Sequence, residues 1–223
     1  MKFSQTLYEK VSEVWDKTHR HPFVVGLGTG ELPVESFIRY MKQDYVFLID
    51  YAKLFAFGAV KARDIETMGY FAKLLDETLH GEMDLHRHYA ERFGITNQQL
   101  EETKPTPINL AYTRYMLNVA QNGSLEELIS TLLPCMWSYW EIGKLLAKNY
   151  PDSTEHPLYG NWINMYASKE FGALATWLIN LLDQLVDGKP QRELDIIEEH
   201  FLTTSRFEYM FWDMVYQGGD WPV

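Results

Sequence analysis

The chain has 223 residues, of which 46% are hydrophobic and 23% charged, a balance typical of a globular protein with one large core. Its formal net charge of −11 argues against non-specific binding to nucleic acids or to an anionic membrane surface. No apolar run reaches the length of a membrane span, and the first residues contain no apolar signal region. One cysteine cannot form an internal disulfide, so the cytoplasm is the expected compartment.

Hydrophobic spacing and helix-terminating residues predict helices along the whole chain. The predicted helices cover residues 3–18, 33–62, 65–93, 107–122, 125–149, 157–187 and 192–216, with a restart or a continuation at Ser168. Residues 26–30, Gly-Leu-Gly-Thr-Gly, are expected to form a loop, and their spacing is not that of a dinucleotide fingerprint. Thr106 and Pro107 suit the N-cap and the first helical position, Ser124 and Glu127 suit a capping box, and Gly94 suits a C-cap.

Few stretches alternate apolar and polar residues, and neither an internal repeat nor a linker interrupts the chain. We therefore expect one all-α domain over residues 1–223, a helical bundle.

The only cysteine, Cys135, follows a proline inside an apolar segment that reads as buried helix. Tyr139 lies one helical turn beyond it and therefore on the same face. Pro134 removes one backbone hydrogen bond and bends a helix that contains it. These residues suit a nucleophile site, but taken alone they favour a packed helix, because free cysteine is among the most buried residue types.

Asp44, Phe47 and Tyr51 are spaced so that they share one helical face in an almost wholly apolar segment. A buried aspartate is costly unless it is paired or hydrogen-bonded. Two interpretations remain open: Asp44 faces solvent with Tyr51 in the core, or Asp44 faces a pocket and accepts hydrogen bonds from a ligand.

Aromatic residues flank Glu208 at positions 207, 209, 211 and 212. Desolvation raises the pKa of a carboxyl group in such surroundings, which suits a general acid near neutral pH. The alternative, slightly favoured by these residues alone, is an amphipathic helix with Glu208 at its boundary, paired with Arg206 or another surface base.

A histidine-rich segment suggests a competing metal site. Glu77 and His80 form an E-x-x-H motif, and Glu82, His86 and His88 follow. Di-iron bundles use two such motifs, and the chain offers no second one. A polar, partly exposed helix explains the segment better, with a metal-dependent oxygenase using Glu77, His80, Glu82 and His86 as the alternative.

The clusters around Asp44, Cys135 and Glu208, taken together, resemble those of the thiaminase II (TenA) family, whose members share the haem-oxygenase-like fold. The resemblance rests on five blocks in the family's order: His21-Pro-Phe-Val24 with Gly30-x-Leu-Pro33, Gln43-Asp44-Tyr-x-Phe47, Glu82-Met-x-Leu-His86, Leu132-Leu-Pro-Cys-Met-Trp-x-Tyr139 and Glu208-Tyr-x-Phe-Trp212. It implies a homotetramer that binds an aminopyrimidine or thiamin and hydrolyses the bond at the ring-attached CH2, serving thiamin salvage. No metal or cofactor is expected, and exposed aromatics such as Trp162 and Trp177 are candidates for the subunit interface.

The resemblance also implies roles for individual residues. Cys135 matches the nucleophile, Glu208 the acid that contacts the pyrimidine, and Asp44 the carboxylate that holds the substrate's amino group. The expected substrate-binding residues are Phe47, Tyr51, Tyr112, Tyr139, Tyr166 and Phe211. Some relatives have tyrosine in place of Phe47, so a hydroxyl contact is absent there. Retention of Cys135 places the chain with the branch tied to pyrimidine salvage.

The implied chemistry is covalent catalysis, in which a thiolate adds to the ring while an acid protonates a ring nitrogen. No Lys, Arg or His lies within a turn of Cys135, and the helix N-terminus is too distant to lower its pKa. Asp44 acting as its base is one hypothesis. A non-catalytic, pyrimidine-binding regulatory protein is a further alternative, and the sequence does not rank the possible substrates.

Overall fold

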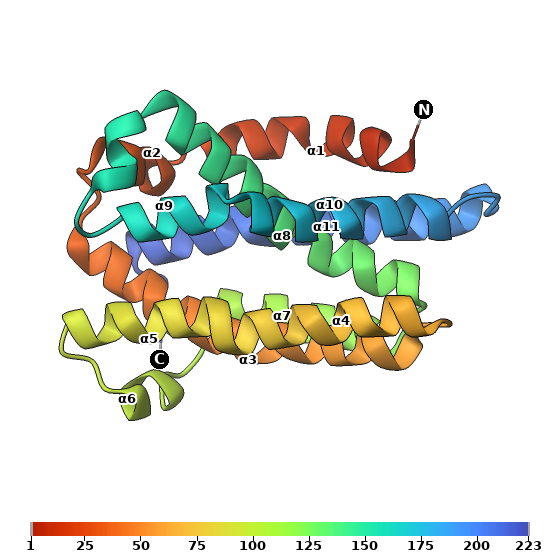
Figure 1. Ribbon diagram of the computed structural model, residues 1–223, viewed down its shortest axis with the longest axis horizontal. Coiled ribbons are helices and arrows are strands. Elements are labelled where there is room, and N and C mark those ends of the chain that lie inside the picture. Colours follow the sequence, from red (N-terminus) through yellow and green to blue (C-terminus); the bar gives the residue numbers. More distant parts are fainter. Residues whose placement is uncertain (1, 223) are drawn as a thin grey trace. The chain divides into compact units, whose positions relative to one another are not determined.

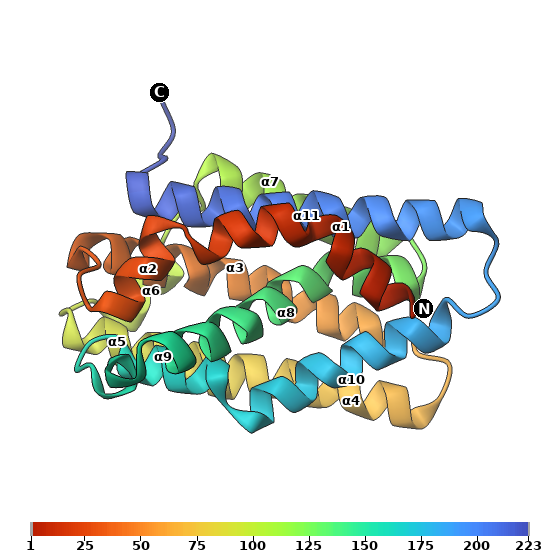
Figure 2. The same cartoon turned by 90° about the horizontal axis from the view of Figure 1, so that it is seen from above.

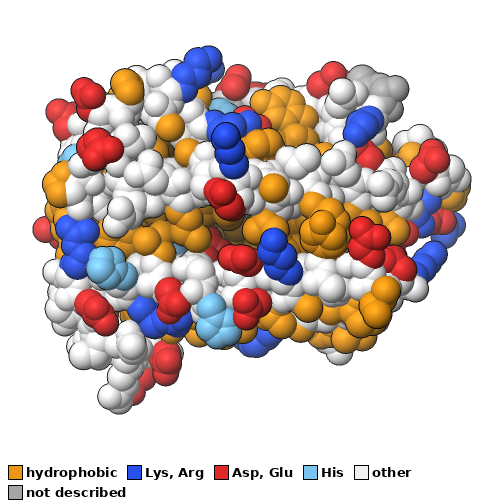
Figure 3. All heavy atoms as spheres, viewed as in Figure 1, with side chains coloured by type: hydrophobic (Ala, Val, Ile, Leu, Met, Phe, Trp, Pro, Cys, Tyr) orange, Lys and Arg blue, Asp and Glu red, His pale blue; other side chains and the backbone are white. Residues whose placement is uncertain are grey.

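The computed structural model describes residues 2–222, and all regular secondary structure in that range is helical (Figure 1). The prediction of an all-α fold is therefore confirmed. None of the helices in this range combines the length and the apolarity that crossing a membrane requires. On the face drawn in Figure 3, acidic side chains are scattered among lysine and arginine side chains.

The chain divides into two compact units. Unit 1 consists of residues up to Pro33 together with Ile129–Trp212, and unit 2 consists of Val34–Leu128 together with residues from Asp213 onward. The boundaries at 128/129 and 212/213 lie inside the continuous helices α8 (Leu125–Asn149) and α11 (Gln191–Gln217). No linker separates the units at these two points, and a single domain over residues 1–223 stays a prediction.

Unit 2 is built on α3 (Val34–Lys61), which packs against α4 (Ile65–Glu77) and α7 (Pro107–Asn122). Figure 1 shows α4 and the following α5 (Met83–Arg92) alongside α3, joined by a π-helical turn η1 (Thr78–Glu82). The short α6 (Asn97–Glu101) follows. α3 carries buried side chains along its whole length because helices cover it on more than one side.

Unit 1 contains α1 (Phe3–His19), α2 (Pro22–Thr29), most of α8, the 3₁₀ turn η2 (Pro151–Glu155), α9 (Gly160–Ala167), α10 (Lys169–Leu185) and α11 up to Trp212. α1 packs on α10. The backbone N–H and the hydroxyl of Ser4 both donate to the Asp183 carboxylate at 2.8 Å, which anchors the start of α1 to α10.

The expected loop at residues 26–30 is wrong, because residues up to Thr29 belong to α2. His21 caps this helix by accepting a hydrogen bond from the Phe23 N–H, Pro22 occupies the first turn, and Gly30 ends it with φ 76°. A side chain at Gly28 would place its Cβ 2.4 Å from the Tyr150 ring. The glycines therefore serve close packing of a short buried helix, which local sequence patterns do not reveal.

The predicted helix over residues 65–93 is interrupted by η1, and the prediction missed α6 and η2. Ser168 separates α9 from α10 and caps the latter, accepting from the Phe171 N–H at 3.1 Å. The predicted cap at Thr106 and the capping box of Ser124 and Glu127 are confirmed by their hydrogen bonds. The predicted C-cap at Gly94 is confirmed by its φ of 70°.

Candidate functional site

Asp44 lies on α3 in unit 2, and its carboxylate is almost completely buried, with 3% of the residue exposed. The Tyr40 hydroxyl, one turn earlier, donates to Oδ2 at 2.8 Å. Nε2 of His86 on α5 lies 2.7 Å from the same oxygen. The interpretation in which Asp44 faces solvent is therefore wrong.

The second ring nitrogen of His86 determines how this pair is protonated. Nδ1 lies 2.8 Å from the backbone carbonyl of Glu82, and a carbonyl can only accept, so Nδ1 carries a hydrogen. One further proton is shared between Nε2 and Asp44. Burial lowers the pKa of His86, but the hydrogen bond and charge of Asp44, with the charge of Glu82, outweigh burial and raise it. The pair therefore favours an imidazolium beside a carboxylate.

Aromatic side chains surround the same face of α3. The rings of Phe47 and Tyr51 are stacked with centroids 5.4 Å apart, and the Tyr112 ring of α7 lies 5.2 Å from Phe47. All three residues are buried. Within unit 2 the structure thus brings together Phe47, Tyr51 and Tyr112 as packed aromatic rings, and Asp44 lies one turn before Phe47 on the same face of α3.

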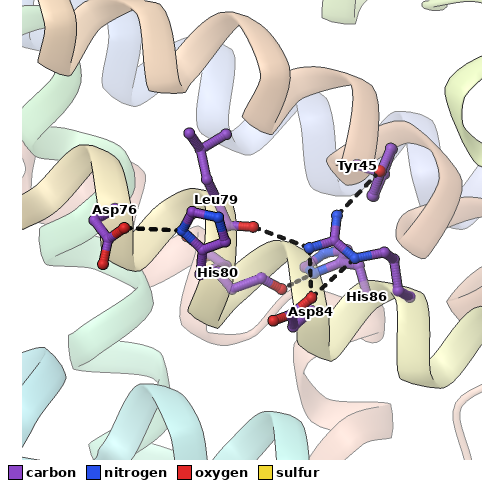
Figure 4. A network of polar contacts seen from close by, with 8 residues as sticks. Tyr45, Asp76, Leu79, His80, Asp84 and His86 are labelled. Atoms are coloured by element: carbon purple, nitrogen blue, oxygen red, sulfur yellow. Dashed lines mark hydrogen bonds and ion pairs between the residues drawn. The ribbon is translucent and has the colours of Figure 1, made fainter.

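Arg87 ties the segment bearing His86 to α3, as Figure 4 shows around the labelled Tyr45, Leu79 and Asp84. Its guanidinium donates to the Leu79 carbonyl inside η1 at 2.9 Å, to the Tyr45 hydroxyl at 3.2 Å and, through Nε, to Asp84 at 3.0 Å. One side chain therefore holds the π-helical turn, the start of α5 and α3 together.

The metal-site alternative does not fit this geometry. His80 is exposed and its Nδ1 lies 2.9 Å from Asp76 (Figure 4). Both ring nitrogens of His86 face protein acceptors, the Glu82 carbonyl and Asp44. Within residues 2–222, no three His, Cys, Asp or Glu side chains converge as a metal-binding group. The ligand set suggested by Glu77, His80, Glu82 and His86 is therefore not assembled.

Cys135 lies on α8 in unit 1 and is half-buried. Tyr139, one turn later, is buried, and its ring centroid lies 4.9 Å from that of Tyr166 on α9 and 5.1 Å from that of Trp212 on α11. The face of α8 that bears the cysteine is therefore packed against two other helices of the unit.

Gly143 continues this face of α8, one turn beyond Tyr139, and explains the close approach of α9. A Cβ at this position would lie 2.5 Å from the carbonyl carbon of Tyr166 and 2.6 Å from the backbone N of Ala167. Only glycine lets the backbone of α9 come this close, which places the Tyr166 ring beside Tyr139.

Glu208 on α11 is buried, with 2% of the residue exposed, whereas Arg206 is exposed. The interpretation of Glu208 as a boundary residue of an amphipathic helix is therefore wrong. Glu208 lies one turn before Trp212, as Cys135 lies one turn before Tyr139, and Tyr139 and Trp212 are in ring contact. α8 and α11 run in the same direction in Figures 1 and 2. Cys135 and Glu208 consequently lie on the same side of that contact. Phe211, which precedes Trp212 on α11, is buried.

Sequence reasoning missed two features of the site. The sequence associates His86 with the metal-site alternative, whereas in the structure it pairs with Asp44, and its block Glu82-Met-x-Leu-His86 belongs to the family resemblance. Trp162 was expected at an exposed interface, but it is 0% exposed and its ring lies 4.5 Å from Tyr166. The Trp162 expectation is wrong because α9 is covered on this face within unit 1.

Comparisons with known proteins agree with this fold. The TENA/THI-4/PQQC family model matches residues 8–218. The chain is 52% identical to an aminopyrimidine aminohydrolase of Halalkalibacterium halodurans, covering 99% of this chain and 98% of that one. It is 43% identical to an aminopyrimidine aminohydrolase of Helicobacter pylori, covering 97% of this chain and all of that one.

Comparison with solved structures also indicates the TenA fold. A TenA family transcription regulator from Silicibacter sp. TM1040 superposes with a TM-score of 0.89 at 31% identity, over 97% of each chain. A domain with a heme oxygenase-like fold from Shewanella denitrificans superposes with a TM-score of 0.75 at 16% identity, over 96% of this chain and 91% of that one, which shows the fold alone. The chain belongs to the TENA/THI-4/PQQC family.

Proposed function

We infer that the protein is an aminopyrimidine aminohydrolase that hydrolyses 4-amino-2-methylpyrimidine compounds in thiamin salvage. The observation that carries this inference is similarity of 52% and 43% identity, over almost the whole chain, to two proteins of that name. The reaction converts aminomethylpyrimidine and water into hydroxymethylpyrimidine and ammonia. Slower cleavage of thiamin at the same CH2 is part of the proposal.

We assign the chemistry to Cys135, Glu208 and Asp44. The Cys135 thiolate forms a bond to a ring carbon while the Glu208 carboxyl group donates its proton to a ring nitrogen. The ring is then electron-rich and expels the amine, which leaves as ammonia after taking up the proton that Asp44 removed from the Cys135 thiol, and an exocyclic methylene remains. Asp44 accepts a hydrogen bond from the amino group of the pyrimidine. It is also the base proposed for the Cys135 thiol.

The second half restores the ring. Water adds its oxygen to the methylene carbon and gives one proton to Asp44, the bond to the Cys135 sulfur breaks, and the ring-nitrogen proton returns to Glu208. The proton on Asp44 then returns to the Cys135 sulfur. Electrons and protons balance, because one water is consumed and one ammonia is released. The buried state of Glu208 and the half-buried state of Cys135 support these roles, since a group that protonates a ring must work out of bulk water. Phe47, Tyr51, Tyr112, Tyr139, Tyr166 and Phe211 are the proposed pocket walls.

The test is steady-state hydrolysis of aminomethylpyrimidine by the wild type, Cys135→Ser and Glu208→Gln. Loss of the general acid is expected to lower kcat by roughly 10²–10⁴-fold. Glu199→Gln is the matched control, because Glu199 is an exposed glutamate on the same helix, and it should retain wild-type turnover. Near wild-type turnover by Cys135→Ser would show that covalent catalysis by this residue is wrong.

The same assay distinguishes an enzyme from a regulatory protein, the alternative that is suggested by the description of the Silicibacter protein as a transcription regulator. A pyrimidine-binding regulator would bind aminopyrimidines tightly and hydrolyse none of them. A substrate panel of aminomethylpyrimidine, its formylated relatives and thiamin, compared by kcat/KM, then ranks the leaving groups.

We also propose that the protein is a homotetramer in the cytoplasm. The exposed apolar side chains of Val60 (82%) and Ile65 (87%), at the junction of α3 and α4, support the oligomer, because a subunit interface would remove them from water. Analytical ultracentrifugation measures the assembly state, and a sedimenting monomer at micromolar concentration would contradict the proposal.

A further inference from the structure

We propose that His86 is a positioning residue of this hydrolase, which holds Oδ2 of Asp44 so that Oδ1 is kept for the amino group of the substrate. The inference rests on the proposed function. Its starting observation is the fully buried imidazole of His86, which the mechanism above does not use.

The two oxygens of Asp44 are treated differently. Tyr40 and His86 both hydrogen-bond to Oδ2, at 2.8 and 2.7 Å, and no hydrogen bond made by the described residues ends on Oδ1. Two donors on one oxygen prevent the carboxylate from rotating. Oδ1 is therefore left for a donor other than these two side chains, a ligand or a water molecule. The substrate's amino group is such a donor.

His86 is itself held in one orientation. Its Nδ1–H donates to the Glu82 carbonyl at 2.8 Å, so the ring cannot turn without losing that bond. Arg87, the next residue, anchors the segment to Tyr45, the neighbour of Asp44 on α3 (Figure 4). Each bond in the chain from Glu82 through His86 to Asp44 therefore fixes the next group, the arrangement by which supporting residues set the geometry of a reacting one.

The π-helical turn η1 is what brings His86 to α3. Buried residues on α4 and η1 recur at Thr67, Phe71, Leu74 and Thr78, with the three- and four-residue spacing of an α-helix. The next buried residues are Met83 and His86, so the buried stripe advances by five residues across η1. An uninterrupted α-helix would have turned Glu82 and Leu85 inward instead. π-helical turns occur frequently at functional sites. This one turns His86 inward, where it meets Asp44.

A purely structural role explains this arrangement less well. A buried ion pair is weak support for stability, because desolvation offsets most of the attraction, and apolar residues of similar volume replace such pairs at little cost. Positioning also predicts effects on Asp44 that packing does not. The charged and titratable groups facing His86 are Asp44 and Tyr40 from α3 and Glu82 from its own helical segment.

The experiment compares His86→Leu, which removes both ring bonds, with His86→Gln, whose amide can still donate to Asp44. His88→Gln is the matched control, because His88 is exposed and two residues away on the same helix. We expect His86→Leu to lower kcat/KM for aminomethylpyrimidine by about 10²-fold, because Asp44 is no longer held in place. In His86→Leu, the acidic limb of the pH profile of kcat/KM should also move to higher pH. His86→Gln should recover part of the lost kcat/KM and part of the shift in the profile.

A double-mutant cycle tests whether His86 acts through Asp44. In an Asp44→Asn background, His86→Leu should change the Kd for hydroxymethylpyrimidine by no more than about threefold, because the group it positions has already been altered. Full additivity of the two substitutions would overturn the proposal.

Other outcomes are also decisive. If His86→Leu matches His88→Gln in kcat/KM and in pH profile, the inference is wrong while the proposed function stands. If the wild type hydrolyses no aminopyrimidine, the proposed function fails first. If the His86 variants do not fold, ¹⁵N spectra of the wild type replace them: hydroxymethylpyrimidine should shift the His86 Nε2 resonance, and an unchanged resonance on saturation overturns the inference.

Discussion

Gly143 provides the most direct test of how the cysteine-bearing helix is packed. Replacing it with alanine adds one methyl group inside α8, where its Cβ would lie 2.5, 2.6 and 2.8 Å from three backbone atoms of Tyr166 and Ala167. Backbone atoms cannot swing aside as the end of a flexible side chain can. α9 must therefore move away from α8, and the Tyr166 ring moves with it.

The expected magnitude follows from two opposing contributions. Overpacking a tightly packed site costs about 1–3 kcal/mol. Alanine is better than glycine inside a helix by about 0.5–1 kcal/mol, which offsets part of that loss. We expect a net destabilisation of up to about 2.5 kcal/mol, or a Tm lower by up to roughly 10 °C for a chain of this size. Because Tyr166 is a proposed pocket residue, kcat/KM should decrease as well.

Gly69→Ala is the matched control. Gly69 is exposed inside α4, and a Cβ there would meet no atom within 4 Å. This substitution should raise the free energy of unfolding by about 0.5–1 kcal/mol. The difference between the two variants, measured by urea denaturation at constant m, isolates the cost of the contact with α9. If Gly143→Ala proves as stabilising as Gly69→Ala, the close approach of α9 to α8 is refuted.

Three further predictions concern stability. Because the pKa of His86 is raised, its pairing with Asp44 contributes fully to the free energy of unfolding below the ordinary histidine pKa of about 6.5. This contribution is lost as the pH rises through the raised pKa. The difference in stability between wild type and His86→Leu, measured by denaturation, should therefore shrink with rising pH. Ser168→Ala removes the N-cap of α10 and should cost about 1 kcal/mol in urea denaturation; an unchanged midpoint would show that this cap contributes no stability. Because α8 and α11 each run through both units, circular dichroism and tryptophan fluorescence should report one coincident thermal transition, and two separate transitions would contradict the single-domain prediction.

Much of the fold follows from local patterns in the sequence. Helix caps such as Thr106 and Ser124 satisfy backbone groups a few residues away, so their spacing is visible in the sequence and the structure bears it out. The α2 helix does not follow from local patterns, because tertiary packing stabilises it. Its glycines are poor helix formers, and the helix exists because Phe23, Val24 and Leu27 are buried and Tyr150 packs against Gly28.

In the candidate site, too, some features follow from local sequence patterns and others depend on tertiary packing. Residues one turn apart share a helical face, so the sequence by itself determined that Tyr139 accompanies Cys135 and that Asp44, Phe47 and Tyr51 lie together. It left open whether Asp44 and Glu208 are buried, because both are bordered by apolar residues on several sides. Only the tertiary structure decided that both are buried, and that His86 is the partner of Asp44. Burial of the two carboxyl groups depends on which helices pack around α3 and α11, and periodicity within one helix does not show that. For His86 the reason is the π-helical turn at Thr78–Glu82, which shifts the buried face of its helix by a step that periodicity in the sequence does not reveal.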